Sequence, residues 1–181
     1  GPVYINDKIV VPASKTWEFS NYIRGGKLEK EGAGKLILKG DAGFYSWQNT
    51  EINGGILDIR GRHSSGIKIG SAGTLITNSN TKIGKDVINK GILKNVGKGA
   101  IIEGNYTAEY GSVTEAEIGT KLIVKGTVKI DGRERNQALG STLRVLNNNY
   151  VTAAPTTATV IEAEKGIEGK FEKVETDELI N

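Results

Sequence analysis

The sequence predicts an all-β fold in which short strands wind into a solenoid of stacked coils. Glycine introduces one short apolar run after another, and the leading leucines follow each other at steps of 21, 18 and 18 residues, at Leu36, Leu57, Leu75 and Leu93. A glycine turn and a short strand repeated at this spacing are typical of stacked β coils. No window carries a sustained stripe with a 3.6-residue period, so we expect almost no helix.

The composition agrees with strands joined by glycine turns. The chain has 181 residues, of which 25 are glycine and only three are proline. Glycine is near twice its usual share of ~7%, while isoleucine, valine, leucine and threonine fill the intervals between the turns. The absence of cysteine excludes disulfides and thiolate metal sites. No apolar run approaches the ~18 residues of a membrane helix.

The net charge of +3 is unevenly distributed along the chain. Residues 162–181 hold seven acids and three lysines, a net charge of −4, so the first 161 residues carry +7. Lysines at 27, 30, 35, 39, 121, 125 and 129 alternate with apolar residues, as on the solvent face of strands, where lysine also discourages edge pairing. We therefore interpret these lysines as outward-facing and expect no nucleic-acid partner.

Short strands are expected in order along the chain up to about residue 105. The first predicted segments are 3–5, 9–11 and 17–19. The clearest repeat follows, with strands at 34–40, 50–52 and 56–59 and with the turn Asn53-Gly54-Gly55, whose residues tolerate positive φ. Segments of about four residues continue to residue 105, and their apolar positions are two apart, so one face of each points inward.

The pattern changes after residue 105, where longer strands are predicted at 106–114, 121–125, 127–130 and 141–146. An open solenoid end exposes apolar core and unpaired strand edges. We therefore divide the chain into coils at 3–105 and into C-terminal coils with a cap at 106–181. Gly1-Pro2 is interpreted as a remnant of tag cleavage, and the chain as a fragment of a longer protein.

The most specific motif spans residues 28–59. It reads LEKEGAGKLILKGD over 28–41, then Tyr45, then TEINGGILDI over 50–59. This order resembles the passenger-associated repeat of bacterial type V autotransporters, although Lys35 stands where that repeat has threonine and Trp47 where it has a small residue. Segments 99–107, 140–145 and 159–174 are similar to the end of such passengers.

The resemblance implies a right-handed parallel β-helix that ends in an autochaperone-like cap. It also implies export across the outer membrane of a Gram-negative bacterium, to the cell surface or the medium. In such proteins an outer-membrane β-barrel follows the passenger in the same chain. An effector, often a subtilisin-like serine protease or an adhesin, lies upstream.

On this resemblance we expect a non-catalytic, monomeric stalk segment without a cofactor, whose cap nucleates folding during secretion and which displays the upstream effector. The alternative is an adhesin module that binds a host protein or glycan, which an exposed aromatic row on one face would favour. The aliphatic and aromatic side chains expected to form the folding core of the cap are Leu122, Val124, Val128, Ile130, Leu143, Val145, Val160, Ile161 and Phe171.

Candidate catalytic residues are few and scattered. His63 is the only histidine and lies in a polar stretch without a Gly-x-Ser-x-Gly elbow, so we expect a loop histidine rather than part of a triad or a metal site. A polysaccharide-cleaving enzyme would need two facing carboxylates. The candidate acids do not recur at one position of the repeat: Asp58, Asp86, Glu103 and Asp131. Aromatic residues at 17–22 and 44–47 are expected to pack over the coil or to close its entry.

Overall fold

The computed structural model describes residues 1–132, 139–147 and 158–176, and these residues form short β-strands and no helix. Sheet A contains β1 (Val3–Tyr4), β4 (Ile23–Gly25), β7 (Ala42–Phe44), β10 (Arg62–His63), β13 (Lys82–Ile83), β16 (Ile101–Ile102), β19 (Leu122–Val124) and β22 (Ile161–Ala163). Sheet B contains β2 (Lys8–Val10), β5 (Glu29–Glu31), β8 (Thr50–Ile52), β11 (Ile67–Ile69), β14 (Val87–Asn89), β17 (Tyr106–Ala108), β20 (Val128–Ile130) and β23 (Ile167–Gly169). Sheet C contains β3 (Thr16–Phe19), β6 (Lys35–Leu38), β9 (Gly55–Ile59), β12 (Gly73–Thr77), β15 (Ile92–Asn95), β18 (Val113–Glu117), β21 (Thr142–Leu146) and β24 (Lys173–Thr176).

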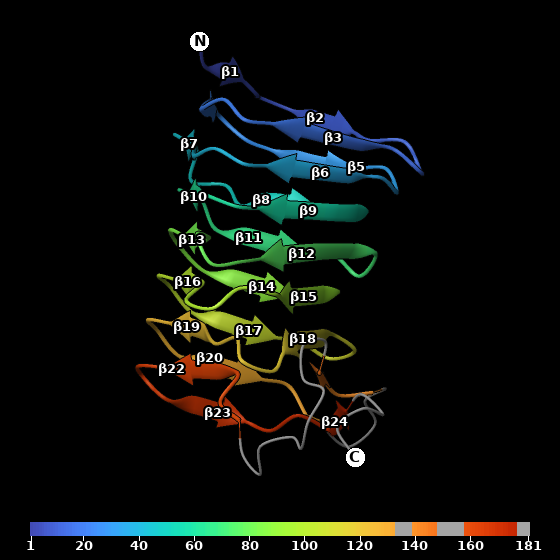
Figure 1. Ribbon diagram of the computed structural model, residues 1–181, viewed down its shortest axis with the longest axis vertical. Coiled ribbons are helices and arrows are strands. Elements are labelled where there is room, and N and C mark those ends of the chain that lie inside the picture. The colour runs from blue at the N-terminus through green and yellow to red at the C-terminus, as the bar shows by residue number, and fades with distance from the viewer. Residues whose placement is uncertain (133–138, 148–157, 177–181) are drawn as a thin grey trace.

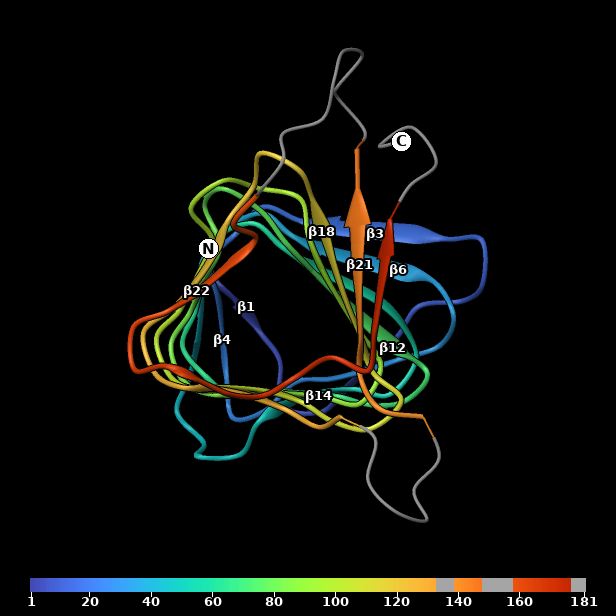
Figure 2. The same ribbon diagram turned by 90° about the horizontal axis from the view of Figure 1, so that it is seen from below.

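The three sheets run side by side along one axis, with the N-terminus at one end of the stack and β22 to β24 at the other (Figure 1). Within each sheet all neighbouring strands pair in parallel, so each inner strand pairs with its counterparts in the preceding and the following coil. Figure 2 looks up from the C-terminal end and shows the chain passing anticlockwise from sheet A through B to C as it nears the viewer, which makes the solenoid right-handed. This is the usual hand of parallel crossover connections. The predicted parallel β-helix is therefore confirmed.

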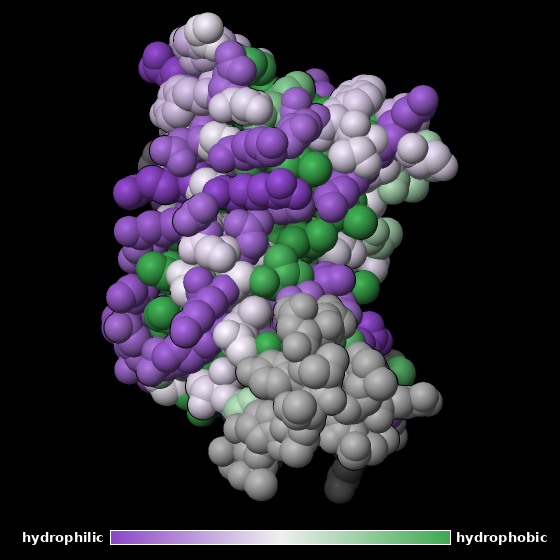
Figure 3. Space-filling view, in the orientation of Figure 1, coloured by the Kyte–Doolittle hydropathy of each residue, from purple (hydrophilic) through white to green (hydrophobic). Residues whose placement is uncertain are grey.

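The repeat of leucines becomes one column of buried side chains in sheet C. Leu36, Leu57, Leu75 and Leu93 are neighbours in register and are fully buried. Each contributes roughly 1.5–3 kcal/mol of burial free energy before conformational entropy is counted. Alternate residues of the same strands face outward. Figure 3 shows hydrophobic residues scattered among hydrophilic ones over this face.

The strands after residue 105 continue the same three sheets, from β17 to β24. A separate cap is not confirmed, and the proposed boundary between 3–105 and 106–181 stays a prediction; residues 133–138, 148–157 and 177–181 of it lie outside the described residues. The single strand expected at 106–114 is wrong. The chain turns a corner there, with Gly111 at φ 77°, and forms β17 and β18 in two different sheets.

Lys30 departs from the expected outward row of lysines. It is paired with Ile9 and Ile52 in an inward-facing column of sheet B, and its side chain is fully buried. Its Nζ donates hydrogen bonds to the carbonyl oxygens of Glu31 (2.9 Å), Gly32 (2.8 Å) and Gly54 (3.0 Å). Burial lowers the pKa of this amine. The local alternation of charged residues concealed the inward position.

The other lysines of the first repeat lie outside, as expected. Lys27 pairs with Glu29 at 2.8 Å, and Lys39 pairs with Glu18 at 2.8 Å. Ion pairs on the protein surface add little to stability. Among the described residues, no helix is long and apolar enough to cross a membrane.

Candidate functional site

Four of the residues expected in the folding core lie inside the C-terminal coils. Leu122 and Val124 on β19 and Val128 and Ile130 on β20 are all buried. They belong to the same apolar core as the upstream coils. Their burial agrees with a structural role, and their part in nucleation stays a prediction.

The other five expected core residues are partly exposed: Leu143, Val145, Val160, Ile161 and Phe171. At the C-terminal end of the solenoid, an apolar hollow of about 300 Å³ brings six of the nine residues together: Val128, Ile130, Leu143, Val160, Ile161 and Phe171. Leu122, Val124 and Val145 do not line it. Among the described residues, the side chains at this end of the core are less completely buried than those in the middle of the stack.

His63 corrects the expectation of a loop histidine. It lies on β10 with an exposed fraction of 1%, between Ala42 and Ile83 in the inward column of sheet A. A hydrogen bond of 2.7 Å joins its Nε2 to Oγ1 of Thr50, which lies 2.9 Å from Oγ of Ser65. The alternation of His63, Ser65, Ile67 and Ile69 in the sequence was the signal that could have placed the ring inside.

The surroundings of His63 do not form a catalytic triad. The Phe44 ring lies 5.3 Å from the imidazole, and among the described residues Nδ1 has no hydrogen-bond partner. No carboxylate therefore orients the ring, and Ser65 is joined to Thr50 rather than to His63. Burial lowers the pKa of His63 to about 4, so the ring is neutral at pH 7. The group fills the core as a polar, uncharged side chain.

The candidate acids are held in ordinary structural contacts. Asp58 is buried and pairs with Arg60 at 3.1 Å and with Lys35 at 3.6 Å. Oδ1 of Asp86 accepts a hydrogen bond from the backbone N–H of Asn105. Glu103 pairs with Lys82 at 3.0 Å, and Asp131 directly follows β20. In the parts of the chain that are described, no three His, Asp or Glu side chains gather where they could hold a metal ion.

Aromatic side chains stand on the outside of the first coils. Phe44 is buried, as expected, whereas Trp17, Tyr22, Tyr45 and Trp47 of the same group have exposed fractions of 42%, 47%, 73% and 93%. Tyr4, outside that group, is 62% exposed. The Tyr22 hydroxyl lies so close to Gly43 that a side chain there would collide with it. Exposed aromatic side chains are thus present near sheet A, and whether they bind a ligand stays a prediction.

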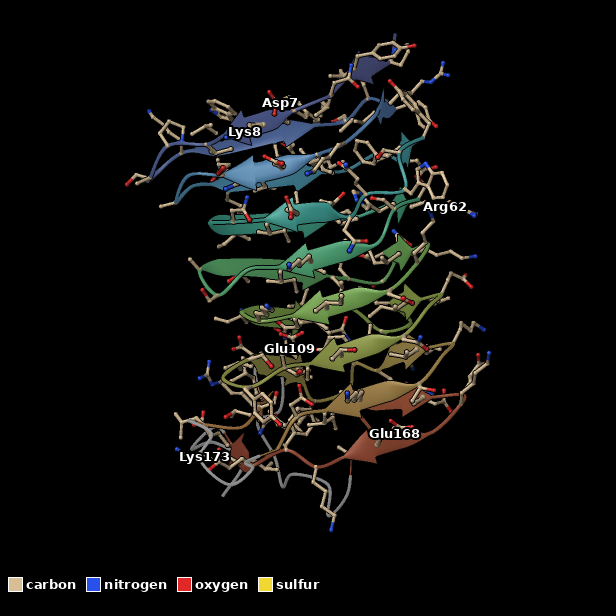
Figure 4. The ribbon with its side chains drawn as sticks, turned by 180° about the vertical axis from the view of Figure 1, so that it is seen from behind. Asp7, Lys8, Arg62, Glu109, Glu168 and Lys173 are labelled. Carbon is tan, nitrogen blue, oxygen red and sulfur yellow. The ribbon has the colours of Figure 1, made fainter. Side chains whose placement is uncertain are left out.

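Cationic side chains continue this surface along sheet A. The guanidinium of Arg24 lies 5.8 Å from the centre of the Tyr4 ring, and these two residues are register neighbours. Arg62 is the register neighbour of Lys82, and both border a shallow hollow of about 410 Å³. Figure 4 shows Arg62 projecting outward from the sheet A side of the solenoid.

We call this surface the A face, and it consists of Tyr4, Tyr22, Arg24, Gly43, Arg62, Ser64, Lys82 and Gly84. Its floor is made of small residues, and its sides carry rings, cations and the carboxylate of Glu103, which lines the same hollow as Arg62 and Lys82. Within the described residues, Arg24 and Arg62 form no ion pair, whereas Lys82 is paired with Glu103. This arrangement is better suited to binding a flat, negatively charged ligand than to catalysing a reaction.

The sequence matches no protein-family model, and no curated protein and no solved structure is similar enough to count as a match. The resemblance to autotransporter passengers therefore depends on the motif at 28–59, on the segments 99–107, 140–145 and 159–174, and on the agreement of the β-solenoid with the fold that they imply.

Proposed function

We propose that this chain is a non-catalytic structural segment of an autotransporter passenger. In this proposal it forms a β-helix stalk at the surface of a Gram-negative bacterium, linked to an upstream effector and a downstream outer-membrane β-barrel, and it acts as a monomer. The observation that carries the proposal is the unbroken parallel pairing of three eight-stranded sheets, in which each coil is built on the one beside it.

The proposed mechanism is folding from the C-terminal coils onward. A folded coil presents one free strand edge in each of the three sheets. An arriving coil adds one strand to every sheet and buries aliphatic side chains against the previous coil. Because the contacts join neighbouring coils, folding can spread along the stack once one end has formed. We propose that folding begins in the coils from residue 106 onward. Folding outside the cell would then help to drive export of the rest of the chain.

Two matched variants test where folding begins. Val87 and Val128 are both fully buried in the same inward column of sheet B, separated by Tyr106. Val87→Ala and Val128→Ala should each cost roughly 2 kcal/mol. If the C-terminal coils nucleate folding, Val128→Ala slows refolding roughly tenfold, whereas Val87→Ala mainly speeds unfolding. Stopped-flow refolding and unfolding measure both rates, and the reverse assignment would refute the proposal.

A second candidate function is an adhesin module that binds a host protein or glycan. The exposed tyrosines and unpaired arginines of the A face favour it. The two functions are compatible, since a stalk can carry a binding surface on one of its three sides.

A further inference from the structure

We infer that the A face binds a polysaccharide that carries uronate carboxylates, with its sugar rings on Tyr4 and Tyr22 and its carboxylates on Arg24, Arg62 and Lys82. This inference rests on the second candidate function and does not depend on the stalk proposal. Its starting observation is that aromatic rings, unpaired guanidinium groups and a floor of small residues occur together on one side of the solenoid.

The spacing of the coils fits an extended sugar chain. Neighbouring strands of a sheet lie about 4.8 Å apart, close to the length of one pyranose unit in an extended polysaccharide. Tyr4, Arg24 and Gly43 follow one another in register, and Arg62 and Lys82 do so in the neighbouring outward column. A chain lying along the solenoid axis would therefore meet one coil with each sugar.

The floor of the A face leaves room for rings to lie flat. Gly43 lets the Tyr22 hydroxyl lie over the backbone. Ser64 and Gly84 form the floor of the hollow beside Arg62, and a Cβ on Gly84 would stand only 2.7 Å from the Ser64 carbonyl oxygen. Larger side chains at these positions would fill the hollow. Exposed rings beside a shallow polar trough are suited to stacking on the apolar faces of sugars.

The two unpaired arginines favour an anionic chain, although the carboxylates of Glu103 and Asp41 lie beside Lys82 and Arg62. Arginine binds a carboxylate through two parallel hydrogen bonds, and Arg24 and Arg62 have no ion-pair partner among the described residues to give up. Lys82 is already 3.0 Å from Glu103, so it contributes less. Asp41 is the acid beside Arg62, and its Oδ1 accepts the backbone N–H of that residue at 2.9 Å.

An acidic peptide is the competing ligand. The strands of sheet A use their backbone groups for pairing with the next coil, so a peptide on this face would find side chains but no free strand edge. Stacking on exposed tyrosines favours rings over a peptide backbone. The sugar chain is therefore the better fit, and the peptide becomes a control in the test.

The test measures binding of the full chain to polygalacturonate and to hyaluronate by affinity electrophoresis and calorimetry. Fully methyl-esterified polygalacturonate keeps the sugar backbone without charge, and polyglutamate keeps the charge without sugar. We expect binding to at least one polyuronate, and an affinity at least roughly tenfold lower for both controls. The inference would be overturned if the chain bound neither polyuronate. It would also be overturned if polyglutamate bound as tightly as the polyuronates.

Variants place the binding on the A face. Arg62→Ala and Tyr22→Ala should each weaken binding roughly tenfold. Lys129→Ala removes the same charge from the exposed outer face of sheet B and should change the affinity less than about twofold. If Lys129→Ala lost as much affinity as Arg62→Ala, binding would depend on overall charge rather than on the A face, and the inference would be wrong. Thermal unfolding checks that each variant folds. If Arg62→Ala or Tyr22→Ala does not fold, Arg62→Gln or Tyr22→Leu takes its place. Refolding kinetics of Val87→Ala and Val128→Ala test the stalk separately.

Discussion

Lys30 and His63 are both buried, and the two side chains differ in how their nitrogen atoms are compensated for the loss of water. The Lys30 ammonium donates to three carbonyl oxygens and so keeps its hydrogen bonds. The His63 ring keeps one hydrogen bond and loses its charge, with its pKa lowered to about 4 by burial. An unpaired buried charge is far costlier than a neutral ring with one unsatisfied nitrogen, which explains the difference.

The histidine makes stability depend on pH. The unfolded chain has the ordinary His pKa of ~6.5 and binds the proton more tightly than the folded chain, in which the pKa of His63 is about 4. Neutral His63 therefore contributes roughly 3 kcal/mol to the free energy of unfolding above pH 6.5, and this contribution is lost as the pH falls toward 4. Urea unfolding at pH 7.0, 5.5 and 4.0 should show this slope in the native chain and a shallower one in His63→Leu. Identical slopes would contradict the assignment.

Lys30→Met should destabilise the protein by roughly 2–4 kcal/mol, because three carbonyl oxygens lose their buried donor. The matched control is Lys39→Met, which removes an exposed lysine from a surface ion pair and should change little. The free energy of unfolding from urea titrations compares the two. Equal effects would mean that the carbonyl contacts of Lys30 contribute nothing beyond its charge.

At the scale of elements, the corners between sheets decide where strands begin and end. Gly55 opens β9 at φ 65°, and a Cβ there would collide with the Gly34 carbonyl and stand 2.7 Å from Nζ of Lys30. Position 55 thus requires a residue that adopts a positive φ and has no Cβ, which only glycine provides. The Asn-Gly-Gly turn expected from the sequence has this structural cause.

Gly55→Ala should cost roughly 3 kcal/mol or more, since strain in φ and steric overlap add. Gly99→Ala is the control: its φ is 92°, yet a Cβ would meet nothing within 4 Å, so only backbone strain of roughly 1–2 kcal/mol applies. Thermal unfolding measures the difference between them. A Gly99→Ala variant as unstable as Gly55→Ala would show that overlap at the corner is unimportant.

The corner between β17 and β18 was the element that local pattern could not show. Apolar residues stand two apart at Tyr106, Ala108 and Tyr110, so the segment reads as the start of one long strand. Inside the fold, Tyr106 and Thr114 face each other across the interior, and their hydroxyl oxygens lie 2.6 Å apart. Asn89 donates a second hydrogen bond to the Tyr106 hydroxyl at 2.9 Å. The corner itself is a local turn, in which the Ser112 N–H donates to the Glu109 carbonyl oxygen at 3.1 Å and Gly111 takes a positive φ, so Gly111 is the local residue that announces it.

For the whole molecule, we expect the stack to depend on its C-terminal coils. Deleting residues 106–181 removes every strand from β17 to β24 and exposes the apolar end of the remaining core. The remaining coils should then become sensitive to protease. Deleting residues 1–20, which removes β1 to β3, should leave the other coils resistant. Limited proteolysis followed by mass spectrometry distinguishes these outcomes, and resistance of the 1–105 fragment would count against nucleation from the C-terminal side.

The spacing of leucines and glycines by itself determined the solenoid, because a short turn and a period of two leave a chain few other ways to bury Leu36, Leu57, Leu75 and Leu93 together. Tertiary structure alone decided the inward place of Lys30, the partners of His63 and the assembly of the A face. Those outcomes depend on which residues of different coils become neighbours. That register is set by contacts about twenty residues apart, which local alternation does not contain.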